Sequence, residues 1–138
     1  MILCAWILLW LPACQTAYFD TTAHIPTHAV CALNMDSVLM DNDSVGNDWT
    51  IAYTCNGRAI TDGERFTLPV NTTEDISIKI TVTEKDKYPD NGETTAVITL
   101  EEGATACAEV TIQENKGRFR GNVAHWQFHF WVKVVQWL

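Results

Sequence analysis

Hydrophobic and polar residues alternate most regularly between positions 76 and 83 of the chain. The hydrophobic positions are Ile76, Ile78, Ile80 and Val82, and the residues between them are Ser77, Lys79, Thr81 and Thr83. A period of two places successive side chains on opposite faces of an extended backbone. The pattern therefore predicts a strand with one buried face and one exposed face.

Weaker forms of the same alternation predict seven more strands. We expect them at residues 28–35, 49–55, 58–60, 66–70, 94–100, 106–112 and 123–135. Between the second and third of these, Asn56-Gly57 is the dipeptide that a type I′ hairpin turn favours, because both central residues need positive φ. It predicts a tight hairpin at this point.

The last predicted strand carries the most aromatic residues. One face holds Trp126, Phe128, Phe130, Val132 and Val134, and the other holds His125, Gln127, His129, Trp131 and Lys133. An edge strand this hydrophobic would invite association with other chains. We therefore expect it in the centre of a sheet, with the aromatic face in the core.

Eight short strands separated by turn residues, with no helical pattern after residue 17, predict an all-β fold. The spacing is typical of an antiparallel β-sandwich, with Ig-like and C2-like topologies as the leading candidates. If every connection is antiparallel, successive loops alternate between the two ends of the sandwich. Residues 36–48, 61–63, 84–93 and 114–122 would then lie at one end.

The length and the charge of the chain limit its organisation and its partners. A chain of 138 residues suits one ordinary domain, which we place at residues 18–138. Its 17 acidic and 9 basic residues give a formal net charge of −8. This balance argues against a nucleic-acid partner, whose phosphates require a basic surface.

The first 17 residues contain no charged side chain, and their apolar stretch is too short to span a bilayer. Residues 1–17 therefore read as an export signal with small residues suited to cleavage. The segment Leu11-Pro12-Ala13-Cys14 also resembles the lipobox of bacterial lipoproteins, which implies lipidation of Cys14 as an alternative to simple secretion. Either interpretation places the domain outside the cell or on its surface, and membrane attachment would come only through Cys14.

Three cysteines remain in the domain, namely Cys31, Cys55 and Cys107. Export permits a disulfide between two of them, and the sequence leaves the pairing open. The alternative is that all three are small buried hydrophobic residues. No CxxC or His/Cys spacing supports zinc.

Two acidic segments are candidates for a metal site. The first reads LMDNDSVGNDW from Leu39 and the second reads VTEKDKYPDNG from Val82. Carboxylate and carbonyl oxygens are the ligands that calcium prefers. We expect calcium to be bound, and the candidate ligands are Asp41, Asp43, Asp48, Glu84, Asp86 and Asp90.

This layout is similar to that of secreted C2 domains, in which two Asp-containing loops meet at one end and bind calcium. The resemblance covers about 60 residues, and Glu84 stands where the family's second loop begins with Asp. It implies a C2-like sandwich with a calcium-stabilised acidic edge. The alternatives are that the acids are solvated turn residues, which Asp and Asn favour for local hydrogen bonds, or that another ligand binds there.

The remaining polar residues offer no recognisable catalytic motif. Lys116, Arg118 and Arg120 are expected to form salt bridges with the acidic loops, with anion or membrane-surface binding as the alternative. His125 and His129 are expected to point outward and titrate, with a metal pair as the alternative. No nucleophile elbow or phosphate loop is present. The sequence therefore predicts a non-enzymatic exported module for an extracellular protein or glycan, and the alternative is a small secreted hydrolase.

Overall fold

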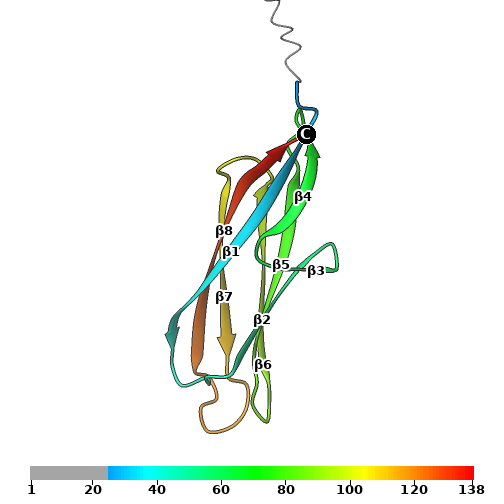
Figure 1. Cartoon of the computed structure of the whole chain (residues 1–138). Helices are drawn as coiled ribbons and strands as arrows, with labels where there is room; N and C mark the ends of the chain where they lie inside the picture. Colours follow the sequence, from blue (N-terminus) through cyan, green and yellow to red (C-terminus); the bar gives the residue numbers. More distant parts are fainter. Residues whose placement is uncertain (1–24) are drawn as a thin grey trace, which may run out of the picture.

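The computed structural model describes residues 25–138 and contains two antiparallel sheets packed face to face (Figure 1). Sheet A has the strand order β4-β1-β8-β7 and sheet B has the order β3-β2-β5-β6. The strands are β1 (His28–Asn42), β2 (Trp49–Cys55), β3 (Arg58–Ile60), β4 (Glu64–Pro69), β5 (Asp75–Glu84), β6 (Asp90–Thr99), β7 (Thr105–Gln113) and β8 (Val123–Trp137). The prediction of an antiparallel β-sandwich of about eight strands is confirmed. The export and lipidation predictions fall on residues 1–17, which lie outside the described residues.

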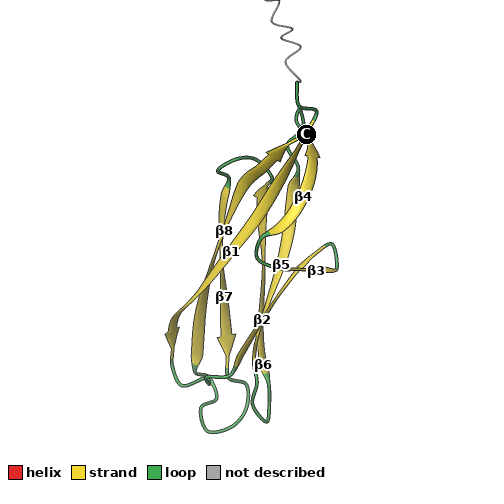
Figure 2. Cartoon of the chain, in the orientation of Figure 1, coloured by secondary structure: helices red, strands yellow, loops and turns green. Residues whose placement is uncertain are grey.

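The strand order differs from that of a constant-type Ig sandwich. In an Ig-like sandwich of the constant type, the first two strands share one sheet. Here β1 and β2 lie in different sheets. The described residues fold into strands joined by loops, without a helix (Figure 2).

The core between the sheets is built on the strand that the sequence placed centrally. β8 lies between β1 and β7, and its Phe128 and Phe130 are almost fully buried. Tyr53 from β2 packs edge-on against both rings, at centroid distances of 6.0 and 6.2 Å. Edge-to-face contacts of this kind add to the stabilisation from burial alone. The predicted inward and outward faces of β8 are confirmed.

The tight turn predicted at Asn56-Gly57 is also present. Asn56 has φ of 50° and Gly57 has φ of 77°, as a type I′ turn requires. The turn joins β2 to the three-residue strand β3, which pairs with the end of β2. The local sequence is thus sufficient to specify this hairpin.

Two predicted loops are shorter in the structure. β1 continues from Asp36 to Asn42, because β8 pairs with it over these residues. The pairing register shifts once, between Leu39 and Asp41. The predicted loop at 84–93 reduces to residues 85–89, because Glu84, the last residue of β5, pairs with Asp90, the first residue of β6. The prediction that residues 36–42, 84 and 90–93 are loop residues was wrong.

Three of the four loops that the sequence assigned to one end do meet there. Residues 43–48, 85–89 and 114–122 form what we call the loop end, joined by the bonds from Asp43 N to Val123 O and from Lys85 N to Asp48 O. Residues 61–63 lie halfway along the sandwich instead. There Gly63 N donates to Leu33 O, and Asp62 Oδ1 accepts from Met35 N. The reason is that β4 pairs only with the first part of β1.

The two termini of the described chain lie together at the opposite end (Figure 1). Leu138 N donates to His28 O, and Leu138 O accepts from the amides of Thr27 and His28. The loop end is consequently the end remote from both termini.

Candidate functional site

The loop end contains three buried carboxylates. Glu84 is 3% exposed, Asp90 is 2% exposed and Glu114 is 6% exposed. We call these three residues the carboxylate cluster. They are the buried acidic side chains among the residues that the structure describes.

Strand alternation explains why acids occupy buried positions here. Glu84 continues the inward series that runs through Ile80 and Val82 of β5, and Asp90 opposes it at the start of β6. Glu114 follows β7, two residues after the fully buried Ile112. The cluster therefore occupies the inward-facing positions where three strands reach the loop end.

A glycine brings the two sheets together beside the cluster. Gly92 is buried in β6, and a Cβ added to it would lie 2.5 Å from Cγ1 of Val110 and 2.7 Å from the carbonyl oxygen of Thr111. Only a residue without a side chain permits this approach of β6 to β7. The close approach brings the ends of the two strands, and with them Asp90 and Glu114, to the same place.

A second glycine allows the β1–β2 loop to cover the cluster. A Cβ on Gly46 would lie 2.1 Å from Oε1 of Glu84. The loop is held by Asn42, whose Oδ1 accepts from Val45 N at 2.9 Å and whose Nδ2 donates to Gly46 O at 2.5 Å. Val45 is buried and anchors the same loop to the core. The carboxylate of Glu84 is thus shielded from water by backbone.

Burial and like charge raise the pKa of two members of the cluster. Loss of hydration raises the pKa of Glu84 above its ordinary value of 4.5, and the nearby charges of Asp86, Glu114, Asp90 and Asp48 raise it further. Burial, followed by the charges of Asp90 and Asp86, raises the pKa of Glu114 as well. The folded state therefore disfavours full ionisation of these carboxyl groups.

Two oxygens of the cluster have no hydrogen-bond partner. Oε2 of Glu84 and Oδ2 of Asp90 are buried and unpaired. The other oxygen of Asp90 accepts from the amide nitrogen and from Nδ2 of Asn115, at 3.1 and 2.8 Å. An ionised carboxylate that is buried without a partner is costly. Either a proton or a bound cation would remove this cost.

Four of the six predicted metal ligands gather here. Asp48, Asp86 and Asp90 all lie close enough to Glu84 for their charges to raise its pKa. Asp86 is exposed at the β5–β6 turn, where its Oδ1 accepts from Tyr88 N at 2.5 Å. Glu114 belongs to the same group but was missed in the sequence.

The other two predicted ligands lie elsewhere. Asp41 is on the outer face of sheet A and pairs with His125, with Oδ1 2.6 Å from Nδ1. Asp43 is exposed at the start of the β1–β2 loop. Within residues 25–138, no group of three or more His, Cys, Asp and Glu side chains is arranged so that it could hold a metal ion.

The basic side chains of the loop at residues 114–122 do not form ion pairs with the acids. The ion pairs of residues 25–138 are Arg58–Glu64, Lys79–Glu93 and His125–Asp41. The prediction that Lys116, Arg118 and Arg120 form salt bridges with the acidic loops was therefore wrong. Lys116 instead lies over the ring of Tyr88, with Nζ 5.3 Å from the centroid, and Arg118 lies 5.7 Å from the ring of Phe119.

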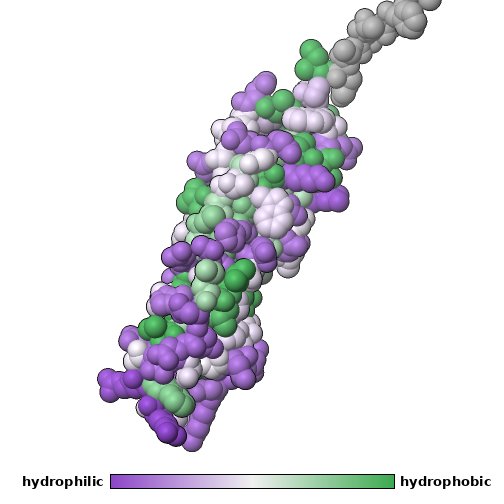
Figure 3. Space-filling view, turned by 90° about the vertical axis from the view of Figure 1, so that its left-hand side faces the viewer, coloured by the Kyte–Doolittle hydropathy of each residue, from purple (hydrophilic) through white to green (hydrophobic). Residues whose placement is uncertain are grey.

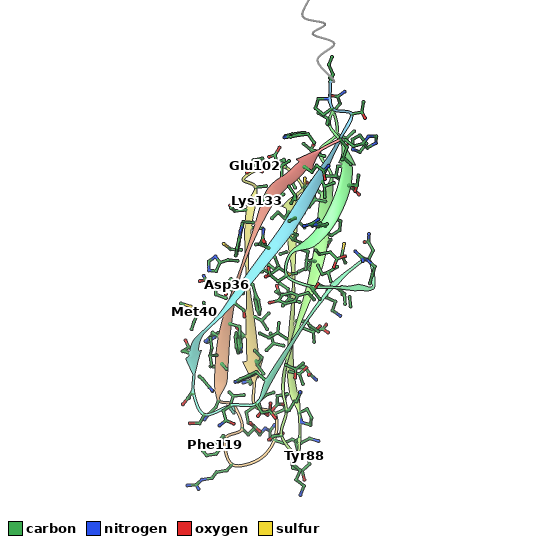
Figure 4. All side chains as sticks on the ribbon, in the orientation of Figure 1. Asp36, Met40, Tyr88, Glu102, Phe119 and Lys133 are labelled. Atoms are coloured by element: carbon green, nitrogen blue, oxygen red, sulfur yellow. The ribbon has the colours of Figure 1, made fainter. Side chains whose placement is uncertain are left out.

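The surface above the cluster is aromatic and basic. Tyr88 and Phe119 are about half exposed at the tips of their loops (Figure 4). A hollow of about 330 Å³ is lined by Lys87, Tyr88, Pro89, Asp90, Asn115 and Lys116. The end of the molecule around these loops is largely hydrophilic (Figure 3).

A second cavity, of about 170 Å³, lies at the opposite end, where its lining includes Cys31, Leu68, Leu100 and Trp137. Cys31 and Cys55 are buried and unpaired, as the interpretation as buried hydrophobic residues predicts. Cys107 is exposed on sheet A, so the same interpretation was wrong for this residue. Its alternation with the inward Ala106 and Ala108 could have indicated this.

The outward position predicted for the two histidines of β8 is correct, and each has a partner. His125 pairs with Asp41, as described above. His129 lies between Cys107 and Gln127, at 3.4 Å from Sγ and 3.1 Å from Oε1.

The fold and the site together define a two-sheet antiparallel sandwich with a buried acidic end. Comparisons with protein-family profiles, with curated proteins and with solved structures found no match. Residues 25–138 include no helix long and apolar enough to cross a membrane.

Proposed function

We propose that this protein is a non-enzymatic exported or cell-surface module, with a binding or structural role, whose loop end takes up calcium. The observation that carries the proposal is the pair of buried, unpartnered oxygens, Oε2 of Glu84 and Oδ2 of Asp90, among like charges. A cation is the ligand that such a group of oxygens favours. Export of the chain rests on residues 1–17.

Calcium suits this site better than smaller cations. It takes six to eight oxygen ligands in a flexible geometry, including backbone carbonyls and water. Its proposed ligands are the three carboxylates of the cluster, and the charges of Asp48 and Asp86 lie close enough to Glu84 to add to the attraction. Magnesium requires a nearly ideal octahedral shell and gives up its water reluctantly. The carboxylates of the cluster must move together to bind the ion. Residues beside loops can do so more readily than residues in the middle of a strand.

The loop end also offers a surface for a partner. Tyr88 and Phe119 are exposed there beside Lys87, Lys116 and Arg118. Aromatic side chains and arginine are enriched in binding surfaces. An extracellular protein or a glycan is the class of partner that we propose, and calcium would order the loops that present these side chains.

A small secreted hydrolase is the rival function. It would need a cleft that converges on His125, His129 or the acids. Neither of the two cavities described above is lined by either histidine. Asp90 is the one candidate acid that lines either of them, and the lining beside it holds no histidine, serine, threonine or cysteine. A binding module is therefore the function that the geometry supports best.

A calcium titration of the thermal unfolding of the protein tests the proposal. A ligand that binds only the folded state stabilises it by RT ln(1 + [L]/Kd), which is about 1.4 kcal/mol at ten times Kd. Extracellular modules bind calcium with Kd of roughly 10⁻⁴ to 10⁻³ M. We therefore expect a few millimolar calcium to raise Tm by on the order of 5 °C, and equal magnesium to raise it less.

Matched variants identify the site. Glu84→Gln should remove most of the calcium increment and raise Tm without metal, because it deletes a charge that the fold disfavours. Asp43→Asn is the control, since it deletes an exposed charge at the same end outside the cluster. An equal increment in wild type and Glu84→Gln would refute the cluster as the site, and no increment in either wild type or Asp43→Asn would refute calcium binding.

A further inference from the structure

Four polar side chains form a connected chain on the outer face of sheet A. Cys107 and Glu109 lie on β7, and they are the register partners of His129 and Gln127 on β8. Sγ of Cys107 lies 3.4 Å from Nδ1 of His129, and Nε2 of His129 lies 3.1 Å from Oε1 of Gln127. Nε2 of Gln127 donates to Oε1 of Glu109 at 3.4 Å. These contacts lie away from the loop end.

The carboxylate at one end fixes the direction of every hydrogen bond in this chain. Ionised Glu109 only accepts, so Gln127 must present its NH₂ group to it and its carbonyl oxygen to His129. His129 therefore carries its proton on Nε2. Its Nδ1 is left as an acceptor, and the S–H group of Cys107 is the donor that faces it. The arrangement is a thiol held against a base whose tautomer is set by a third side chain.

We propose that Cys107 is a reactive thiol, with His129 as its base, that takes up low-molecular-weight disulfides as a mixed disulfide. The proton on Sγ moves to Nδ1 of His129, and the thiolate attacks one sulfur of the disulfide. A bond forms between Sγ and that sulfur, while the original S–S bond breaks. The departing thiolate takes the proton from Nδ1, so the exchange needs no other oxidant or reductant.

The setting of the pair suits this chemistry. Cys107 is exposed, so a small disulfide can reach it, whereas Cys31 and Cys55 are buried. Two donor atoms fall short of the four that zinc takes in proteins, which favours thiol chemistry over metal binding. The charged and titratable groups around His129 on this face are Asp36 on β1, Glu109 on β7, and His125 and Lys133 on β8.

The test is the rate at which glutathione disulfide modifies Cys107 in the full chain, read by mass spectrometry of the peptide that contains it. At pH 7 a free thiol, with an ordinary pKa of about 8.5, is mostly protonated, whereas a free imidazole, with an ordinary pKa of about 6.5, is mostly neutral and can accept a proton. Assistance by a histidine base should therefore be visible at this pH. We expect His129→Asn to slow the modification about tenfold or more at pH 7. The two rates should converge near pH 9, which is above the ordinary pKa of a free thiol.

Controls separate this role from a merely structural one. His125→Asn changes an outward histidine of the same strand and should react like the wild type. Gln127→Leu removes the hydrogen bond that holds the proton of His129 on Nε2, so this variant should give an intermediate rate at pH 7. Burial raises the pKa of the Cys31 thiol, so Cys31 serves as an unreactive internal reference.

Three results would overturn the proposal. They are equal rates in wild type and His129→Asn at pH 7, a difference that persists undiminished at pH 9, or modification of Cys107 no faster than that of Cys31. The persistent difference would mean that His129 affects access to the thiol and not its ionisation.

Discussion

Replacement of Gly92 by alanine is the sharpest test of how β6 meets β7. The added methyl group would lie 2.5 Å from a side-chain carbon of Val110 and 2.7 Å from the backbone oxygen of Thr111. The Val110 side chain is almost fully buried, and the Thr111 oxygen is backbone. Neither can move aside without displacing a strand.

The expected cost follows from these contacts. Overpacking of a filled core costs about 1 to 3 kcal/mol. For a domain of this size, this corresponds to a fall in Tm of about 4 to 12 °C. We also expect Gly92→Ala to lower the calcium increment, because separation of β6 from β7 moves Asp90 away from Glu114.

Thermal and urea unfolding of both forms measure the effect, with Asn91→Ala as the control. Asn91 is the exposed neighbour of Gly92 in the same strand, so its replacement should change the free energy of unfolding by less than about 0.5 kcal/mol. If Gly92→Ala is as stable as Asn91→Ala, the close approach of the two sheets is wrong.

Two further predictions concern the core and the carboxylate cluster. Phe128→Ala should lower the free energy of unfolding by about 3 to 5 kcal/mol, because the side chain is fully buried. Gln127→Ala on the outer face of β8 should lower it far less. Near-equal losses in urea melts would refute the assignment of the inward and outward faces of β8. The pKa values of Glu84 and Glu114 are raised in the folded state. Above pH 4.5 the folded protein therefore binds more protons than the unfolded chain. Without metal, its free energy of unfolding should consequently fall as the pH rises from about 4.5 through the raised pKa values. Tm measured from pH 4.5 to 7.5 should show this decline in the wild type and a smaller decline in Glu84→Gln, and an unchanged slope in the variant would contradict it.

Local sequence was sufficient for most of the strands. The regular alternation of residues 76–82, the Asn56-Gly57 dipeptide and the aromatic face of β8 each specify their structure through short-range geometry. The strand ends are harder to predict. Asp and Glu are uncommon in strands, so the sequence predicts loops at Asp36, Glu84 and Asp90. They remain in strands because a paired neighbour continues beside them.

The candidate sites depended on pairing that no local pattern reveals. The alternation from Val110 through Ile112 points to Glu114 as an inward residue, and this signal could have added it to the acidic group. The sequence could not show that Asp41 lies outside the acidic group. Its position depends on the pairing of β1 with β8, which makes His125 its register partner. The contact between Cys107 and His129 has the same origin, since it requires the register of β7 against β8.

The pairing of β1 with β8 also constrains how the chain can fold. All four strands of sheet B lie between residues 49 and 99, and β2, β5 and β6 pair through connections within that range. The two central strands of sheet A, in contrast, are the first and the last of the strands described in residues 25–138. Closing a long loop costs entropy before the contacts that it makes can compensate. We therefore expect sheet B to form early and sheet A to assemble on it as the rate-limiting step. During synthesis, sheet A must wait until β8 has left the ribosome.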